Sequence, residues 1–142
     1  MRLLPSVQKS MPAVLLLLLC LPACILIVEE DDDYFHRHRW RLDVIVYYGR
    51  TYAADDPYTI NFEANGDLYG RADCNDYDGI YETPRNGSLV IREIYSEGER
   101  CGRQSLEDRY FEVLSGAVTY RVRDGELIVT AHNGDHLYFY KD

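Results

Sequence analysis

The sequence predicts a mainly β protein, a small antiparallel β-barrel-like domain of about eight strands with one α-helix. Three observations lead to this prediction. Short segments from Trp40 onward alternate apolar and polar residues, which is the period of a strand with one buried face. Turn residues separate these segments at regular intervals, as in sandwiches and barrels. Only residues 105–117 change to the spacing of a helix.

Five strands are expected before the helix. In the first, Trp40, Leu42, Val44 and Val46 alternate and are expected to face inward. Asn65-Gly66-Asp67 is a tight hairpin signal. Another turn is expected at residues 85–87, before a strand that buries Leu89, Ile91 and Ile94 after a slip of phase. The five segments are residues 40–48, 58–63, 68–74, 79–84 and 88–95.

The helix and three further strands complete the domain. Ser105 can cap the first turn of the helix, and Gly116 marks its end. Between them, the apolar residues fall at helical spacing. The turn dipeptides Asp124-Gly125 and Asn133-Gly134 then separate three strands. These lie in residues 118–125, 126–135 and 136–142, and the helix apolar positions are Leu106, Tyr110, Val113, Leu114 and Ala117.

Residues 1–23 are expected to be a secretory signal. Two cations precede an apolar run that begins at Met11, and no acidic residue occurs before Glu29. The run ends in Leu-Pro-Ala-Cys, which resembles the bacterial lipobox, with the small residue Ala23 before Cys24. We therefore expect Cys24 to be lipidated and to become the mature N-terminus. The protein would then contact the membrane through this lipid anchor.

Two alternatives remain for this segment. Residues 11–28 carry no charge and are near the lower limit of length for an uncleaved membrane anchor, although two prolines weaken such a helix. An ordinary cleaved signal is the other alternative. All three deliver the domain outside the cytoplasm. Because Ile25, not Asp, follows Cys24, we expect the periplasmic face of the outer membrane in a cell with two membranes.

Residues 24–39 are expected to be a linker between anchor and domain. Five consecutive acids, at residues 29–33, favour a solvated, extended spacer. The whole chain has 15 Lys and Arg against 24 Asp and Glu, a formal net charge of −9. Such a chain is a poor partner for nucleic acid, which needs clustered Lys and Arg. An envelope protein is the more reasonable partner.

Two cysteines, Cys74 and Cys101, fall in the expected domain. A pair of cysteines in an exported domain indicates a disulfide, here between positions 27 apart. A reactive thiol and half of a metal site are the alternatives. No other cysteine lies in the mature domain, and no histidine lies between the two.

The acidic residues between Asp73 and Gly79 are candidates for a calcium site or for acid–base catalysis. With Gly79 at the sixth position, a helix–loop–helix calcium loop would begin at Cys74 and end at Arg85, and neither residue fits. Asp76 and Asp78 would share one face of a strand, but no histidine or recognisable pocket accompanies them. No nucleophile, phosphate-loop or metal-helix motif is present. The sequence therefore predicts no catalytic residue, no metal and no cofactor.

Residues 40–142 resemble the META domain, also called the HslJ-like domain, of secreted and lipid-anchored bacterial proteins. The resemblance rests on the order and spacing of several weak motifs over about a hundred residues. One departure is Asp73, where the family commonly has glycine before the cysteine. The matching residues are Trp40, Leu42, Ile60, Phe62, Gly70, Cys74, Asn75, Gly79, Tyr81, Ser96, Cys101, Glu107, Tyr110, Phe111, Leu114, Tyr120, Gly125 and Leu127.

The resemblance implies a barrel-like domain without an agreed enzymatic activity, in a family linked to envelope stress. It implies that Asn75 and Gly79 set the backbone of a turn between two strands, and that Cys74 ties this turn to Cys101. The sequence thus predicts a non-enzymatic, lipid-anchored envelope domain with a binding or structural role. The alternative is a barrel that carries a small apolar molecule, since barrels of this size can enclose one.

Overall fold

Nine antiparallel strands and helix α2 form the part of the chain that the computed structural model describes, residues 35–55 and 57–142. The signal, Cys24 and the first part of the linker lie outside these residues. Among the described residues, no helix is long and apolar enough to cross a membrane. The elements are β1 (Trp40–Tyr47), β2 (Arg50–Ala53), β3 (Thr59–Phe62), β4 (Asp67–Ala72), β5 (Asn75–Glu82), β6 (Val90–Ser96), α2 (Glu107–Ser115), β7 (Ala117–Arg123), β8 (Glu126–Ala131) and β9 (His136–Lys141).

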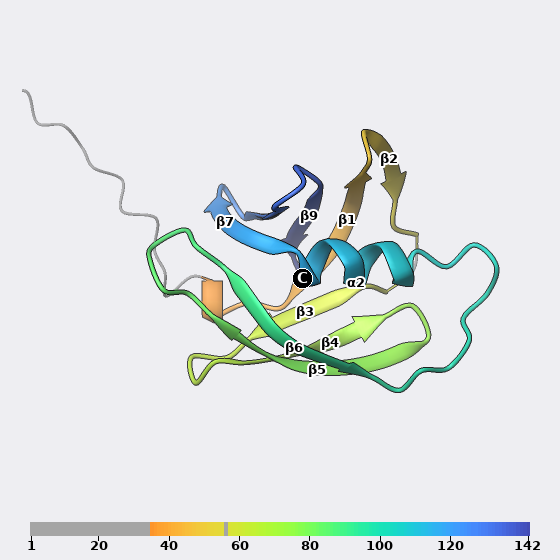
Figure 1. Ribbon diagram of the computed structural model, residues 1–142, viewed down its shortest axis with the longest axis horizontal. Coiled ribbons are helices and arrows are strands. Elements are labelled where there is room, and N and C mark those ends of the chain that lie inside the picture. The colour runs from red at the N-terminus through yellow and green to blue at the C-terminus, as the bar shows by residue number, and fades with distance from the viewer. Residues whose placement is uncertain (1–34, 56) are drawn as a thin grey trace, which may run out of the picture.

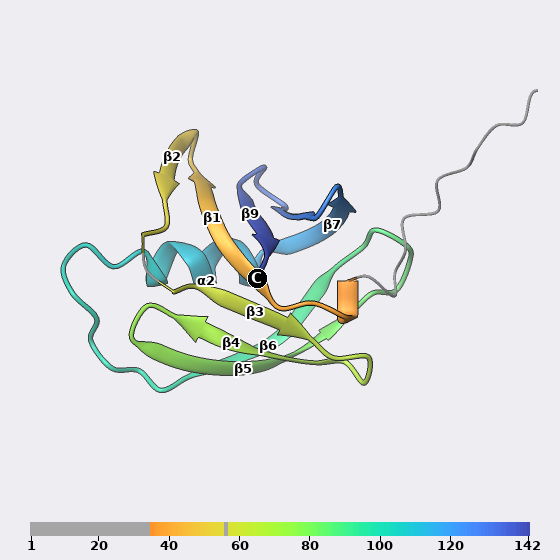
Figure 2. The same cartoon turned by 180° about the vertical axis from the view of Figure 1, so that it is seen from behind.

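The strands form one curved sheet in the order β6-β5-β4-β3-β1-β9-β8-β7, with β2 added beside β1. The two end strands approach each other where Ser88 bridges to Thr119. Backbone hydrogen bonds join them there, from Leu89 N–H to Val118 O at 3.1 Å and from Tyr120 N–H to Gly87 O at 2.9 Å. Helix α2 lies across the rest of the open side and contacts β6, β8, β1 and β9 (Figures 1 and 2). The predicted barrel-like class is confirmed.

Three turns predicted from local chemistry are present. Gly66 and Gly134 adopt φ of 94° and 86°, in the left-handed region that favours glycine. In both loops, the asparagine before the glycine accepts the backbone N–H of the following aspartate at 3.1 Å. Asp124 and Gly125 also have positive φ, as a two-residue hairpin requires. The residues within each of these three turns are therefore sufficient to determine where the chain reverses direction.

Strand β2 was not predicted. The chain reverses after β1 at Tyr48 and Gly49, whose φ values are 46° and 73°. Tyr48 is an uncommon residue for this conformation, and its backbone N–H is held by Asp135 Oδ1 at 2.8 Å. The resulting β1–β2 hairpin projects from the rim of the sheet (Figure 1). Its strand is mostly exposed and lacks the alternation that marks a strand in sequence.

The inward positions of β1 change at a bulge. A register shift against β9 lies between Leu42 and Val44. Trp40, Leu42 and Ile45 are buried, with exposures of 0–1%. The prediction that Val44 and Val46 face the core is therefore wrong, because one extra residue in the strand reverses the alternation. The slip of phase expected in β6 is present as a shift against β5, next to Tyr81.

Strand β5 begins at Asn75, four residues before the expected start at Gly79. Only Asp73 and Cys74 form the turn, since Ala72 pairs with Asn75. The interpretation of residues 73–79 as one turn between two strands is therefore wrong. The local preference of these residues for a turn is outweighed by strand pairing with β4 on one side and β6 on the other.

Helix α2 buries the face that its spacing predicted. Tyr110, Val113 and Leu114 are inside, and the helix ends at Gly116. It begins at Glu107, whose backbone N–H is accepted by Ser105 Oγ at 3.2 Å. Ser105 therefore supplies a capping hydrogen bond from one residue outside the expected position, because Leu106 occupies the N-cap.

The domain starts earlier than the predicted boundary at Trp40. Phe35, which we placed in the solvated linker, is fully buried. Its ring stacks between those of Phe62 and Tyr120, at centroid distances of 4.2 and 4.3 Å. Its carbonyl oxygen accepts the Trp40 indole N–H at 3.1 Å. The last part of the linker, from Phe35 onward, is thus a structural part of the domain.

Candidate functional site

The motif residues Gly70 and Gly79 lie in the interiors of β4 and β5, facing inward. A Cβ at Gly70 would collide with the backbone oxygen of Thr59, and one at Gly79 with that of Glu93. Neither glycine has a positive φ. Their role is therefore to allow neighbouring backbone to approach closely within the sheet.

Gly70→Ala is expected to destabilise the domain by about 1–3 kcal/mol, because the methyl group forces β3 and β4 apart. Gly102→Ala is the matched control, since a Cβ there meets nothing within 4 Å and its φ is not positive. It should change stability by less than about 0.5 kcal/mol. Urea unfolding of both variants provides the comparison, and equal losses would contradict this role for Gly70.

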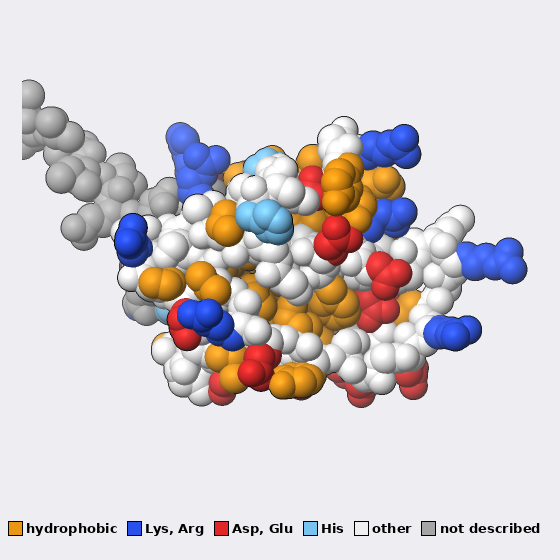
Figure 3. All heavy atoms as spheres, in the orientation of Figure 1, with side chains coloured by type: hydrophobic (Ala, Val, Ile, Leu, Met, Phe, Trp, Pro, Cys, Tyr) orange, Lys and Arg blue, Asp and Glu red, His pale blue; other side chains and the backbone are white. Residues whose placement is uncertain are grey.

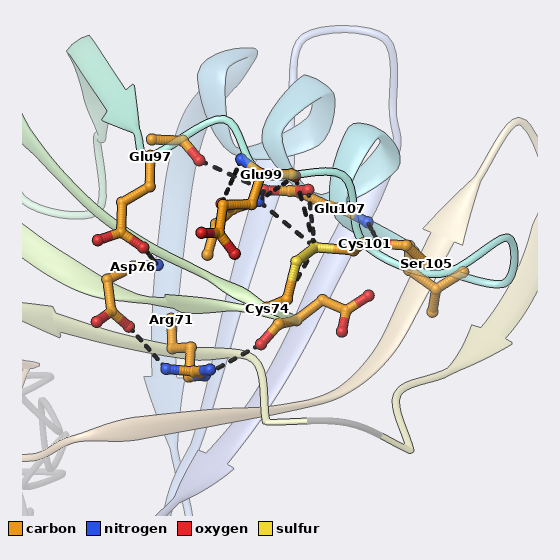
Figure 4. Close-up of a disulfide and its surroundings, with 12 residues drawn as sticks. Arg71, Cys74, Asp76, Glu97, Glu99, Cys101, Ser105 and Glu107 are labelled. Carbon is orange, nitrogen blue, oxygen red and sulfur yellow. Dashed lines mark hydrogen bonds and ion pairs between the residues drawn. A yellow bond between two sulfur atoms is a disulfide. The ribbon is translucent and has the colours of Figure 1, made fainter.

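A disulfide joins Cys74 and Cys101, with their Cα atoms 5.6 Å apart. It links the β4–β5 turn to the loop between β6 and α2, as the hypothesis from the sequence stated. Asp73 precedes it with φ of 56°, a conformation that favours glycine. The glycine expected at this position from the META resemblance would adopt this conformation without strain. The disulfide and its surroundings are drawn in Figure 4.

Asn75 is the centre of a hydrogen-bond network beside the disulfide. Its side chain is fully buried. Its Nδ2 donates to Glu99 O at 2.9 Å and to Glu107 Oε1 at 2.7 Å. Its Oδ1 accepts the Glu99 backbone N–H at 2.8 Å. Asn75 thus fastens the start of β5 to the loop and to the first residue of α2, in addition to the disulfide.

Sequence reasoning missed the partners of this network. Glu107 was identified as a residue that matches the META motif, but its acceptance of the Asn75 amide depends on a contact 32 positions away. Tyr58 also supports the helix start, because its hydroxyl accepts the Leu106 backbone N–H at 2.9 Å. No local signal in the sequence identifies either contact.

Tyr81 closes the opposite end of the barrel. Its hydroxyl donates to Glu63 O at 2.7 Å and lies 3.0 Å from His36 Nδ1. Burial raises the pKa of Tyr81 to about 12. Deeper inside, the hydroxyls of Tyr77 and Tyr110 are 2.6 Å apart, and burial raises the pKa of both well above the ordinary value.

These pKa shifts predict loss of stability in alkali. A raised pKa means that the folded protein favours the neutral phenol, so its contribution is complete below pH 10, the ordinary tyrosine value. It is lost as the pH rises from 10 through about 12, the folded pKa of Tyr81. We expect tyrosinate absorbance and unfolding to rise together in this range.

Tyr77→Phe should reduce this pH dependence, because it removes a buried ionisable group. Tyr48→Phe, which makes the same change at a side chain that is 69% exposed, is the control. Full tyrosine ionisation while the circular dichroism spectrum stays native would contradict the prediction.

The three aspartates considered for acid–base chemistry do not form a site. Asp73 lies in the turn, and Asp76 is paired with Arg71 at 3.1 Å on the outer face (Figure 4). Asp78 is on the same outer face and exposed. Among residues 35–55 and 57–142, no group of three or more metal-ligating side chains is gathered.

The motif geometry agrees with the comparison to known families. A family model for the META domain matches residues 33–142. The chain belongs to the META domain family. The match begins before Phe35, in agreement with the burial of that residue in the META domain core. No curated protein matches the sequence.

Solved structures share the fold of this META domain. A protein from Burkholderia xenovorans, determined by NMR, is 20% identical with a TM-score of 0.66, covering 78% of this chain and 85% of its own. A second NMR structure is 19% identical with a TM-score of 0.58, covering 76% and 92%. A crystal structure of a DUF4847 family protein from Bacteroides vulgatus ATCC 8482 is 12% identical with a TM-score of 0.56, covering 77% and 95%. At these identities the likeness concerns the fold alone.

Proposed function

We propose that the protein is a lipid-anchored domain of the cell envelope with a binding or structural role and no enzymatic activity. The observation that carries this proposal is the Cys74–Cys101 disulfide. Disulfides persist in oxidising compartments outside the cytoplasm. A lipobox-like cysteine at position 24, after an apolar run, provides the anchor in this proposal.

The hydrogen bonds and packing of the motif residues support a role without catalysis in this proposal. The polar groups of Asn75 and Tyr81 form hydrogen bonds within the domain. Gly70 and Gly79 serve the close approach of strands. A catalytic side chain instead has to leave a polar group available to a substrate.

The alternative of an apolar carrier requires space inside the barrel. Large side chains that are less than 2% exposed occupy this interior, and include Trp40, Tyr110, Phe62 and Phe139. A hollow of about 380 Å³, lined by His36, Tyr81 and loop residues, is open to the surface. We therefore favour binding at the outer surface over enclosure of a ligand.

Intact-mass spectrometry of membrane-extracted protein tests the anchor. A mass that starts at Cys24 and includes acyl chains is expected, and Cys24→Ser should abolish it. Reduction should add the mass of two hydrogen atoms, for one disulfide. A full-length mass with free thiols would contradict the proposal.

Membrane fractionation tests the location. In a cell with two membranes, we propose that the protein is found in the outer-membrane fraction and is protected from protease added outside intact cells. Recovery in the inner membrane alone would overturn this location. A role in envelope stress is part of the proposal, and a deletion strain complemented with Cys24→Ser should remain sensitive to stress.

A further inference from the structure

The outer face of β4, β5 and β6 carries two cross-strand rows of opposite composition. In one row Tyr69 pairs with Asp78, and Asp78 pairs with Tyr95. In the next row the centre is apolar and the flanks are acidic, because Ile80 lies between two carboxylates. The three apolar side chains are exposed, at 48% for Tyr69, 44% for Ile80 and 61% for Tyr95. We call this surface the checkered face; its members are Asp67, Tyr69, Asp78, Ile80, Glu93 and Tyr95.

The checkered face is visible along the lower edge of Figure 3, where β5 and β6 lie in Figure 1. Hydrophobic side chains there alternate with acidic ones. Exposed apolar groups are common singly, but a contiguous set on neighbouring strands marks an interaction surface. The carboxylates between them determine which kind of partner this surface fits.

The charge of the checkered face is not neutralised from within. Three guanidiniums lie at its margins and already have partners: Arg71 pairs with Asp76 at 3.1 Å, Arg92 with Glu82 at 2.8 Å and Arg39 with Asp142 at 3.0 Å. In the described part of the chain, Asp78 has no ion-pair partner. Asp67 and Glu93 accept hydrogen bonds from neutral groups, the Asn65 amide and the Tyr95 hydroxyl. The face is therefore acidic and open to a cation.

The two tyrosines are placed to hold a cation between them. Tyr69 and Tyr95 both flank Asp78, so their Cα atoms are separated by two strand spacings, about 9.5 Å. A cation between two such rings lies within about 6 Å of each ring centre. The Tyr95 hydroxyl donates to Glu93 Oε2 at 2.8 Å, and interaction with the Glu63 carboxylate raises the pKa of Tyr69. The bond to Glu93 orients the Tyr95 ring, and Asp78, which lies between the two tyrosines in the cross-strand row, supplies a formal negative charge.

We propose that the checkered face binds a Lys- or Arg-rich segment of a protein partner, with one cationic side chain between Tyr69 and Tyr95 above Asp78. This inference rests on the proposed binding role and specifies its partner. The apolar part of the cationic side chain packs on Ile80 and the rings, while its charge meets the carboxylates. Beside Tyr69, a hollow of about 400 Å³ is lined by Arg39 and Arg71. Because both guanidiniums repel a cation, the proposed site does not extend into this hollow.

A second copy of this chain is a poorer occupant. The whole chain carries a formal net charge of −9, so two copies repel each other. A cationic segment instead gains from the same charge, in approach as well as in binding. We therefore commit to a cationic protein segment.

The test measures fluorescence anisotropy of a labelled peptide in which Arg alternates with Thr, added to the detergent-solubilised full chain. Asp78→Asn and the double variant Tyr69→Ala/Tyr95→Ala should each weaken binding roughly tenfold. Added salt should weaken binding to the native chain. A peptide with Glu in place of Arg should not bind.

Two control variants make the same changes elsewhere. Asp124→Asn removes a carboxylate from the β7–β8 turn, and Tyr140→Ala removes a side chain that is 42% exposed on β9. Both should leave peptide affinity within about twofold of the native value. All substituted side chains are exposed, and thermal unfolding of each variant confirms that it is folded.

Three results would overturn the inference. They are no binding of the Arg peptide, equal losses in the Asp78→Asn and Asp124→Asn variants, and a dimer of the native chain that Tyr95→Ala dissociates. The second result would mean that net charge alone attracts the peptide, and the third that the face contacts another copy. None of them alters the mass or the membrane fraction of the protein, so failure here is distinct from failure of the proposed anchor.

Discussion

Phe35→Ala is expected to lower the free energy of unfolding by about 3–5 kcal/mol. The ring is fully buried and stacks on Phe62 and Tyr120, which belong to opposite halves of the curved sheet. Its removal leaves a cavity between β3 and β7, beside the hydrogen bond from Tyr120 N–H to Gly87 O that helps to join the two ends of the sheet. The loss therefore combines the transfer of an aromatic side chain with poorer closure of the fold.

Chemical unfolding of the native chain and two variants measures this effect. His36→Ala is the neighbouring control, since it removes one hydrogen bond with Tyr81 and only partly buried surface. It should cost about 1 kcal/mol. A chain that starts at residue 40 should lose as much as Phe35→Ala, and one that starts at residue 33 should keep native stability. Equal stability of the two truncated chains would show that the domain does begin at Trp40.

Replacing both Cys74 and Cys101 with serine is expected to cost about 3.5 kcal/mol, from loop-closure entropy alone. The closed loop corresponds to a sequence separation of 27. The double variant is preferable to a single one because it leaves no free thiol. Asn75 keeps its bonds to Glu99 and Glu107 in this variant, so the loop should loosen without complete loss of the fold.

Hydrogen exchange should locate the change. Faster exchange is expected for the loop between β6 and α2, which the disulfide holds, and unchanged protection for the β8–β9 hairpin. Asn75→Ala in the native chain separates the two contributions, because it removes the hydrogen bonds and leaves the disulfide. Undiminished stability after reduction would mean that the Asn75 network is sufficient to hold the loop.

The sequence by itself determined the features that depend on neighbouring residues. The Asn-Gly and Asp-Gly turns have positive φ where glycine allows it, and the helix ends at Gly116. The buried positions of α2 follow from the spacing of its apolar residues, and the pair of cysteines in a domain expected to be exported predicted the disulfide. Each of these is decided by local backbone preference or by a small number of possible partners.

Tertiary structure decided the features in which distant segments outweigh local preference. Asn75 to Gly79 resemble a turn but form a strand, because β4 and β6 pair with them on both sides. Phe35 follows a run of acids, yet it is buried by two rings that are far away in sequence. The checkered face exists only because three strands in register place Tyr69, Asp78 and Tyr95 in one row. Register is set by the whole sheet, so no single stretch of sequence could reveal that surface.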